Sequence, residues 1–365
     1  MPIPRCSVDF TFDAEQLALQ EVARRAMDEI DGALLRQLAD DDAGYTPELW
    51  DRLVALGWTS MLHPGEGAGL LEMCIVLEQM GRVPLPGPFL SSAVAATLAA
   101  RALGAQDLLD ELGTGSTRGT VAVQEQGHGD PLGTVRTRAS RKGAGWVLHG
   151  VKPTVVDGHT ADWAIVAALG EEGIRSFLVR NPGGELVPSL DPTRKLARLV
   201  LDATPAVPLG PTGGQADLWR RVLDDVAVAL AAESVGVSGR ALDMATEYAK
   251  VRVVFDQPIA TFQVVKHRIV DMFHALELAR VGVHYAAWSS DGDEPDRVRA
   301  AAMASAYAAE AAVKVTGDDI QLHGGVGFTW ANDAHFLFKR AKQNETLVGG
   351  SGHQWQRLGA QFVEL

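Results

Sequence analysis

The stretch YAKVRVVFDQPIATFQVVKHRIVDM, residues 248–272, decides the fold because it joins two long segments that have helical periodicity. The apolar residues that recur at helical spacing are Leu223, Val226, Leu230, Val237, Ala241, Met244 and Tyr248 before it, and Phe262, Val265, Ile269, Met272, Leu276 and Ala279 after it. The residue before Pro258 is biased away from helical backbone angles. The sequence therefore predicts two long helices joined by a short corner.

This corner carries groups that suit a phosphorylated, planar ligand. Arg252 offers a fixed positive charge for a pyrophosphate, and Phe255 offers a ring face for a base. Gln257 and Gln263 offer amide donors. The alternative is a helix connection with solvated polar side chains, and the corner alone favours that alternative.

A second stretch, QLHGGVGF at residues 321–328, favours the ligand-binding interpretation of the corner. It follows a helical run that ends near Asp318 and Asp319, and its glycines let backbone amides approach a ligand closely. The two stretches, in this order, resemble the acyl-CoA dehydrogenase family. The resemblance covers the whole chain and is strongest from about residue 220 onward.

The resemblance implies a cofactor, partners and a set of binding residues. In that family the arginine, phenylalanine and glutamine of the first motif and the Gln-x-His-Gly-Gly of the second hold the ADP part of FAD across a subunit interface. The cofactor-binding residues expected here are Arg252, Phe255, Gln263, Gln321, Gly324 and Gly325. The expected partners are an acyl-CoA substrate and other subunits, as a homo-oligomer or as a heterotetramer with a catalytic sister subunit.

The periodicity of the chain changes twice. Turns and short β-rich runs begin around Gly113–Gly119, and helical spacing returns near Asp217. The strand candidates are Thr120–Gln124, Gly133–Arg138, Trp146–His149, Trp163–Ala168, Ser176–Arg180 and Leu199–Leu201. We expect an α+β multidomain fold, acyl-CoA dehydrogenase-like, with an N-terminal α-helical domain (1–117), a middle β-barrel or sandwich domain (118–208) and a C-terminal α-helical bundle (214–365). The alanine-rich run Ala300–Thr316 is expected to be buried between helices or subunits, in at least a dimer.

Composition excludes several classes of function. The 365 residues carry a formal net charge of −13 without a basic stripe, which argues against nucleic acid and anionic membranes as partners. Neither Cys6 nor Cys74 has metal-ligand spacing around it, so we expect no metal site, no disulfide and a cytoplasmic setting. No apolar run is long enough to span a bilayer, and the N-terminus has no apolar signal core.

The residue that would remove the substrate α-proton is missing from its usual places. The family's reaction needs a positioned carboxylate base, while the β-hydrogen leaves as hydride. By resemblance, the base positions are Val348, a second near Val226 and a third at Ala331, and none of them is a glutamate. Asp225 and Glu345 are the nearest carboxylates in the sequence, and for each of them an ordinary solvated charge is the favoured interpretation.

The part of the site that would hold the flavin ring also departs from the family. Gln124–Asp130 replaces the family's Thr-Glu-Pro motif, and Val156 stands where a hydroxyl usually bonds flavin N5. The resemblance thus implies an FAD-dependent oxidoreductase of lipid metabolism for the α,β-dehydrogenation of an acyl-CoA. The chain would act either alone with an unusual base or as the base-lacking partner subunit of a heteromer, and the missing glutamates favour the second. The alternative is a non-redox, structural or lyase-like member of the same fold.

Overall fold

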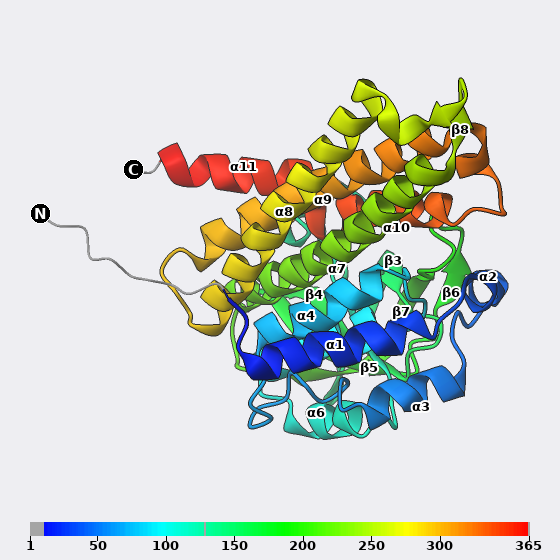
Figure 1. The fold of residues 1–365 in the computed structure, drawn as a ribbon. Helices are drawn as coiled ribbons and strands as arrows, with labels where there is room; N and C mark the ends of the chain where they lie inside the picture. The colour runs from blue at the N-terminus through cyan, green and yellow to red at the C-terminus, as the bar shows by residue number, and fades with distance from the viewer. Residues whose placement is uncertain (1–10, 128, 364–365) are drawn as a thin grey trace, which may run out of the picture.

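The computed structural model describes residues 11–127 and 129–363, and its elements follow the order helices, sheet, helices (Figure 1). The first part contains α1 (Ala14–Asp28), α2 (Gly32–Asp40), α3 (Pro47–Ala55), α4 (Leu70–Gly81), the π-helical segment η1 (Phe89–Ala96), α5 (Thr97–Leu103) and α6 (Gln106–Gly113). The residues Thr46 and Pro47 form a typical helix start for α3, because the Thr46 hydroxyl accepts a hydrogen bond from the Leu49 amide and Pro47 is the first helical residue.

The middle part is a β-barrel. Its elements are β1 (Gly119–Ala122), the short 3₁₀ turn η2 (Leu132–Thr134), β2 (Arg138–Lys142), β3 (Gly145–Val156), β4 (Trp163–Gly170), β5 (Gly173–Arg180), β6 (Glu185–Val187) and β7 (Leu196–Leu209). The pairing runs β4–β2–β3–β7–β5 and returns to β4, which closes the ring, while β1 pairs with β4 and β6 with β7. Leu148, Phe177 and Leu199 are fully buried inside it.

The last part is a helical bundle built on one long helix. It contains α7 (Ala216–Val251), the two-residue strands β8 (Val253–Val254) and β9 (Gln257–Pro258), η3 (Ile259–Thr261), α8 (Gln263–Asp291), α9 (Arg297–His323), η4 (Gly324–Phe328), α10 (Ala334–Thr346), η5 (Leu347–Gly349) and α11 (Gly350–Val363). The predicted helix hairpin is therefore present, with its corner formed by β8, β9 and η3. The expected fold class is confirmed.

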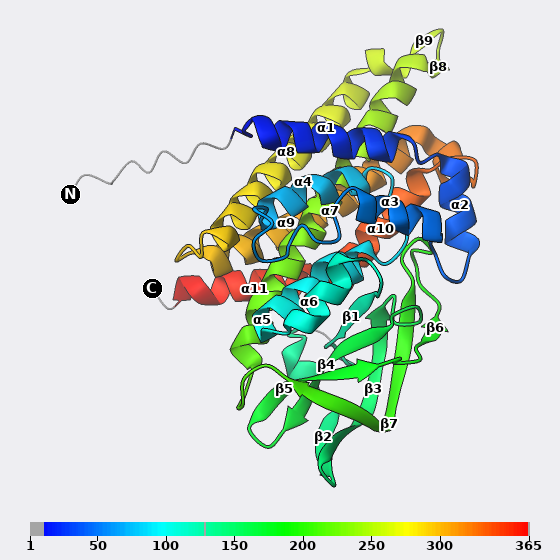
Figure 2. The ribbon, with the colours of Figure 1, turned by 90° about the horizontal axis from the view of Figure 1, so that it is seen from below.

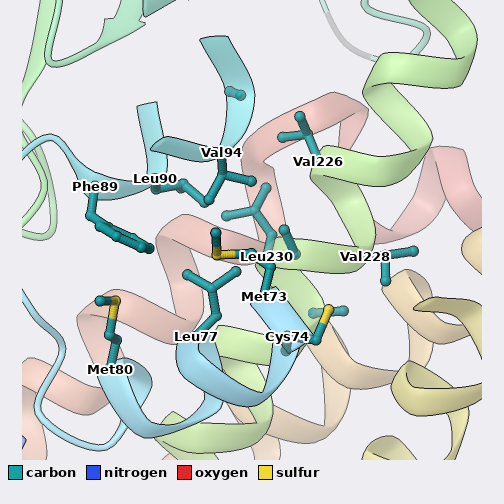
Figure 3. Packing of buried hydrophobic residues seen from close by; sticks show 14 of the residues in the cluster. Met73, Cys74, Leu77, Met80, Phe89, Leu90, Val94, Val226, Val228 and Leu230 are labelled. Atoms are coloured by element: carbon teal, nitrogen blue, oxygen red, sulfur yellow. The ribbon is translucent and has the colours of Figure 1, made fainter. Parts of the chain in front are cut away.

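Two glycines let α4 and α7 cross at very short range. A Cβ on Gly81 would lie 2.1 Å from the Glu233 carbonyl oxygen, and a Cβ on Gly236 would lie 1.8 Å from the Glu78 carbonyl oxygen. Figure 3 shows the core beside this crossing, where Met73 and Leu77 of α4 and Leu90 of η1 pack towards Leu230 of α7. The crossing joins the first and last parts of the chain into one core.

A buried ion network ties the barrel to the bundle. The Arg340 guanidinium in α10 bonds Asp191 before β7 and Glu233 in α7, at 2.5 Å each. Arg194 also pairs with Glu233, at 2.6 Å, and bonds the Asn344 side chain. Burial alone would raise the pKa of Glu233, but the two guanidiniums hold it at about 2. This network anchors the helix that leads into the turn at Val348.

One predicted strand is wrong. Gly133–Arg138 overlaps the end of the 3₁₀ turn η2 and continues as irregular backbone, and β2 begins only at Arg138. The Glu125 carboxylate accepts hydrogen bonds from the Arg136 and Thr137 amides, at 2.9 Å each. A side chain thus replaces the partner strand that these amides would need. Two strands were not predicted, namely β2 itself and β6.

Of the two expectations for the alanine-rich run, burial between helices is confirmed within one chain, and a subunit contact there stays a prediction. Ala300–Thr316 lies in α9, whose alanine face is covered within one chain by α7, α8, α10 and α11. Five exposed large apolar side chains lie on α8, namely Val264, Val270, Phe273, Leu278 and Val281. Among the described residues, no helix is both long and apolar enough to cross a membrane. Cys74 is a buried free thiol, and Cys6 falls outside the described residues.

Candidate functional site

A small chamber lies where η1, the barrel, α7 and the turn η5 meet. Its volume is about 90 Å³. The described residues that line it are Leu90, Ser91, Ala95, Thr120, Val121, Val123, Gln124, Pro131, Thr154, Val156, Val222, Leu223, Val226, Leu230, Leu347 and Val348. Both Val348 and Val226, two of the expected base positions, face this chamber. None of the described lining residues has a titratable side chain.

Val348 reaches the chamber from a strained turn. It adopts φ 51° and ψ 43°, a left-handed conformation that β-branched residues rarely take, and Gly349 and Gly350 follow with φ 87° and φ 79°. Such a conformation costs on the order of 1–3 kcal/mol. The turn thus presents an apolar isopropyl group to the chamber at the place where the family resemblance expects a carboxylate.

The two remaining carboxylate candidates do not line the chamber. The Asp225 carboxylate accepts hydrogen bonds from Ser290 and from Arg297, at 2.5 and 2.8 Å, and lines a separate cavity of about 360 Å³. Burial raises the pKa of Asp225, against the opposing effect of the Ser290 hydrogen bond. Glu345 pairs with Lys342 and lines a small cavity of about 20 Å³ behind the Val348 turn.

The third base position also lies elsewhere. Ala331 is exposed, in the turn between η4 and α10. That turn packs against α2, because the Arg36 guanidinium donates hydrogen bonds to the Trp330 carbonyl oxygen and the Asp333 carboxylate. Ala331 is therefore on the surface beside α2 and is not among the residues that line the chamber.

The barrel wall of the chamber carries the polar side chains of Thr120, Gln124 and Thr154. The Thr120 hydroxyl donates to the Val156 carbonyl oxygen at 2.7 Å. Behind the wall, Lys152 is fully buried and donates to Glu125 at 2.7 Å. Burial lowers the pKa of Lys152 to about 8, and Glu125 limits that decrease. The side chain of Val156 adds no donor for a flavin ring.

The six residues expected to hold an ADP group lie near the C-terminal end of α7, away from the chamber. Arg252, Phe255, Gln263, Gln321, Gly324 and Gly325 are all exposed. The rings of Tyr248 and His323 stack at 4.4 Å, which brings the end of α7 next to the end of α9. The side chains of Arg252, Gln263 and Gln321 form no hydrogen bond or ion pair with any described residue. The contact of these groups with a cofactor remains a prediction.

Gly325 provides a test of whether this end suits a ligand. A Cβ built on Gly325 or on Gly324 meets no atom of the chain within 4 Å. Gly324 has φ 62°, so its own backbone favours glycine, but Gly325 has no left-handed angle. Nothing inside this chain requires glycine at position 325. The space beside both glycines is therefore open to an external group.

The chamber and the ADP-type end are too far apart to serve one cofactor. Val226 and Arg252 are 26 positions apart along α7, which corresponds to about 39 Å at 1.5 Å per residue. This length exceeds that of an extended flavin dinucleotide. Figure 2 shows β8 and β9 projecting at the end of the molecule opposite the barrel. A cofactor held at Arg252 would therefore place its ring in another subunit.

His323 belongs to the second motif, whereas its partner Asp319 was not predicted as part of this site. The two residues form an ion pair one turn apart on α9, directly before Gly324. Their spacing of four residues, acid before base, is a helical pairing signal that the sequence does carry. The stacking of His323 on Tyr248 joins segments far apart in the chain, and no local pattern indicates it.

Comparisons with known proteins agree with the motifs. Residues 13–119 match the family model described as acyl-CoA dehydrogenase, N-terminal domain, and residues 217–362 match that of the C-terminal domain. Acyl-CoA dehydrogenase IpdE2 of Mycolicibacterium smegmatis is 31% identical over 333 residues, which cover 90% of this chain and 92% of the relative.

Two solved structures are similar over nearly the whole chain. A variant of the Tcur3481-Tcur3483 steroid ACAD has a TM-score of 0.86 at 31% identity, covering 96% of this chain and 98% of the other. The ChsE4-ChsE5 complex from Mycobacterium tuberculosis has a TM-score of 0.86 at 28% identity, covering 98% of this chain and 100% of the other.

Proposed function

The chain belongs to the acyl-CoA dehydrogenase family of FAD-dependent oxidoreductases, and from that premise we propose that it is the base-lacking partner subunit of a heteromeric acyl-CoA dehydrogenase. In this role it lends its ADP-binding end to a flavin whose ring is seated on a catalytic sister subunit. The observation that carries the proposal is the chamber beside Val348, which contains no titratable side chain among its described residues.

The two halves of the chain's flavin site fit the cofactor differently. The ADP-type end fits, because it combines an unpaired guanidinium, an exposed ring and two glycines that leave open space. The chamber does not fit a flavin ring. Its volume of about 90 Å³ is well below the roughly 300–1,000 Å³ of typical ligand pockets, and Val156 supplies no side-chain donor. One chain therefore offers half a site, which a sister subunit would complete.

The chemistry explains why the missing carboxylate matters. Dehydrogenation takes a proton from the α-carbon of the thioester and a hydride from the β-carbon, and bound FAD supplies the hydride acceptor. A positioned base contributes typically about 10²–10⁴ to such a rate. Valine cannot accept a proton, and Asp225 and Glu345 are held by other partners outside the chamber.

The chain's own residues would contribute binding and orientation. Arg252 would neutralise pyrophosphate charge with its planar donors, and Phe255 would cover a base. Gln263 and Gln321 would bond the edges of the nucleotide, and Gly324 and Gly325 would expose backbone amides to it. The similarity to the ChsE4-ChsE5 complex and to the Tcur3481-Tcur3483 steroid ACAD, each named for two components, supports a heteromer.

A flavin spectrum tests the proposal. The chain is purified alone and together with a co-expressed acyl-CoA dehydrogenase chain that carries the glutamate base. We expect little flavin absorbance in the chain alone and stoichiometric flavin in the joint complex. Full flavin occupancy in the chain purified alone, with no sister subunit present, would contradict a shared site.

A further inference from the structure

A cavity of about 230 Å³ lies where the N-terminal helices meet the bundle, and its walls come from α1, α2, α4, α7 and α10. It shares no described lining residue with the chamber, and none of the six residues expected to hold an ADP group lines it. Part of its wall is apolar and includes the buried side chains of Met27, Ile30 and Leu337. The cavity is therefore a separate space, to which the proposed function gives no role.

The acidic groups of this cavity already have partners within the chain. Asp31 caps α2, because its carboxylate accepts a hydrogen bond from the Leu34 amide at 2.8 Å. Among the described lining residues, the other carboxylates and two of the guanidiniums belong to three ion pairs, namely Arg24–Asp28, Arg36–Asp333 and Arg82–Asp243. The negative charge at the cavity is thus balanced by the chain itself.

Arg240 of α7 also lines the cavity, but it has no such partner. Its guanidinium forms no hydrogen bond and no ion pair with any described residue. Burial raises the pKa of Asp319 in α9, and the Arg240 charge opposes that rise, but less than the hydrogen bond from His323 does. Because a guanidinium stays charged and has five N–H donors, Arg240 is available to an anion that enters the cavity.

Gln79 of α4 adds a second free polar group. Only 5% of this residue is exposed, and it lines the cavity. Its side-chain amide forms no hydrogen bond with any described residue, although its atoms are not among the enclosed polar atoms of the described chain. Buried polar groups are nearly always hydrogen-bonded, so this amide indicates a hydrogen-bonding group inside the cavity.

We propose that this cavity binds a small carboxylate with an apolar body. Arg240 pairs with the carboxylate, Gln79 donates a further hydrogen bond from its amide nitrogen, and the apolar wall around Ile30 contacts the body of the ligand. A phosphate is less suited, because its second negative charge would face the acids of the cavity without another free guanidinium. The site is independent of the flavin and goes beyond the proposed function.

The volume of the cavity limits the size of this ligand. It lies below the roughly 300–1,000 Å³ of typical ligand pockets. At the packing density of protein interiors, about 0.74, the cavity holds roughly 170 Å³ of atoms, or about nine non-hydrogen atoms. Benzoate has this size, and benzamide has nearly the same shape without the charge. The two compounds therefore separate the ion pair with Arg240 from the apolar contact.

The test is an NMR titration of the purified full chain with benzoate and with benzamide. We expect benzoate to bind at least roughly tenfold more tightly than benzamide, because a charge-assisted hydrogen bond adds about that much affinity. Arg240→Gln should lower the affinity for benzoate to that for benzamide. Arg25→Gln is the matched control, since Arg25 is an exposed arginine of α1 that pairs with Glu21 and does not line the cavity. It should change neither affinity.

Gln79→Met is a second variant, which nearly keeps the side-chain volume and leaves Arg240 in place. It should weaken benzoate binding severalfold, and thermal unfolding should show that each variant is folded. Equal binding of benzoate and benzamide, or equal binding of benzoate to the unchanged chain and to Arg240→Gln, would overturn the inference. So would the absence of saturable binding by benzoate, phenylacetate and hexanoate, since the cavity would then hold only water. Flavin retention in Arg252→Ala tests the proposed function separately and has no bearing on this site.

Discussion

At the scale of single residues, Arg252 is the side chain whose role is most directly measurable. It is exposed, carries a full charge and has no acidic partner among the described residues. We expect Arg252→Ala to weaken FAD retention in the assembled protein by roughly one to two powers of ten, because a charge-assisted contact contributes about 1.5–3 kcal/mol. Flavin content after gel filtration measures it. Unchanged flavin occupancy would show that Arg252 does not bind the cofactor.

Asp225 gives the complementary prediction. Its carboxylate is bound to Ser290 and Arg297 outside the chamber, so it should have no part in proton abstraction. We expect Asp225→Asn to leave the turnover of the assembled complex within about twofold, while removal of a true base would cost about 10²–10⁴. Steady-state kinetics distinguish the two, and Glu345→Gln serves as a parallel test. A collapse of activity in either variant would identify a base that we have excluded.

At the scale of elements, the α4–α7 crossing depends on the absence of a side chain at Gly236. A methyl group there would meet the Glu78 carbonyl oxygen at 1.8 Å, and backbone cannot yield easily. We expect Gly236→Ala to lower the free energy of unfolding by about 3 kcal/mol or more. Gly282→Ala in α8 is the matched control. Its Cβ would have its nearest neighbour at 3.9 Å, so alanine should be neutral or add about 0.5–1 kcal/mol. Denaturant unfolding compares them.

The ion network around Glu233 predicts a defined acid sensitivity. Its folded-state pKa of about 2 lies below the ordinary value of 4.5, so the carboxylate adds stability above about pH 4.5 and loses it as the pH falls towards 2. The contribution is on the order of 3 kcal/mol. Thermal unfolding followed across this range should show it. Glu233→Gln should be less stable at neutral pH, and its stability should fall less steeply below pH 4.5. If the stability of the unchanged chain and of Glu233→Gln fell equally steeply below pH 4.5, this role of Glu233 would be contradicted.

The elements also show which parts of the fold sequence reasoning can predict. The α7–α8 hairpin and the start of α3 depend on local periodicity, capping and proline, and they appear where these signals place them. The strand expected at Gly133–Arg138 does not form. The Glu125 carboxylate, eleven and twelve residues earlier in the chain, accepts hydrogen bonds from the Arg136 and Thr137 amides. Periodicity carries no information about such a contact.

At the scale of the whole molecule, the candidate site could be predicted only in part. The motifs at Arg252 and Gln321 point to one nucleotide end, and the structure brings them together through the Tyr248–His323 stack. The sequence also indicates that Val348 replaces a carboxylate. It cannot show that Asp225 and Glu345 line other cavities than the chamber, because that depends on how far each helix is rotated in the packed chain.

The separation of the two half-sites is a property of the whole molecule too. About 39 Å of helix α7 divides the chamber from the nucleotide end, so in the proposed function the flavin site would span two chains. The exposed apolar side chains of α8, including Phe273 and Val281, leave surface for such a contact. The domain limits at 117, 208 and 214 remain predictions.

The central claim is that this chain contributes binding groups but no base. The most direct measurement is anaerobic bleaching of the flavin band by a panel of acyl-CoA thioesters. It is made on the isolated chain with added FAD and on the complex with a glutamate-bearing sister subunit. We predict no bleaching in the isolated chain and bleaching in the complex. Rapid bleaching in the isolated chain would contradict the account.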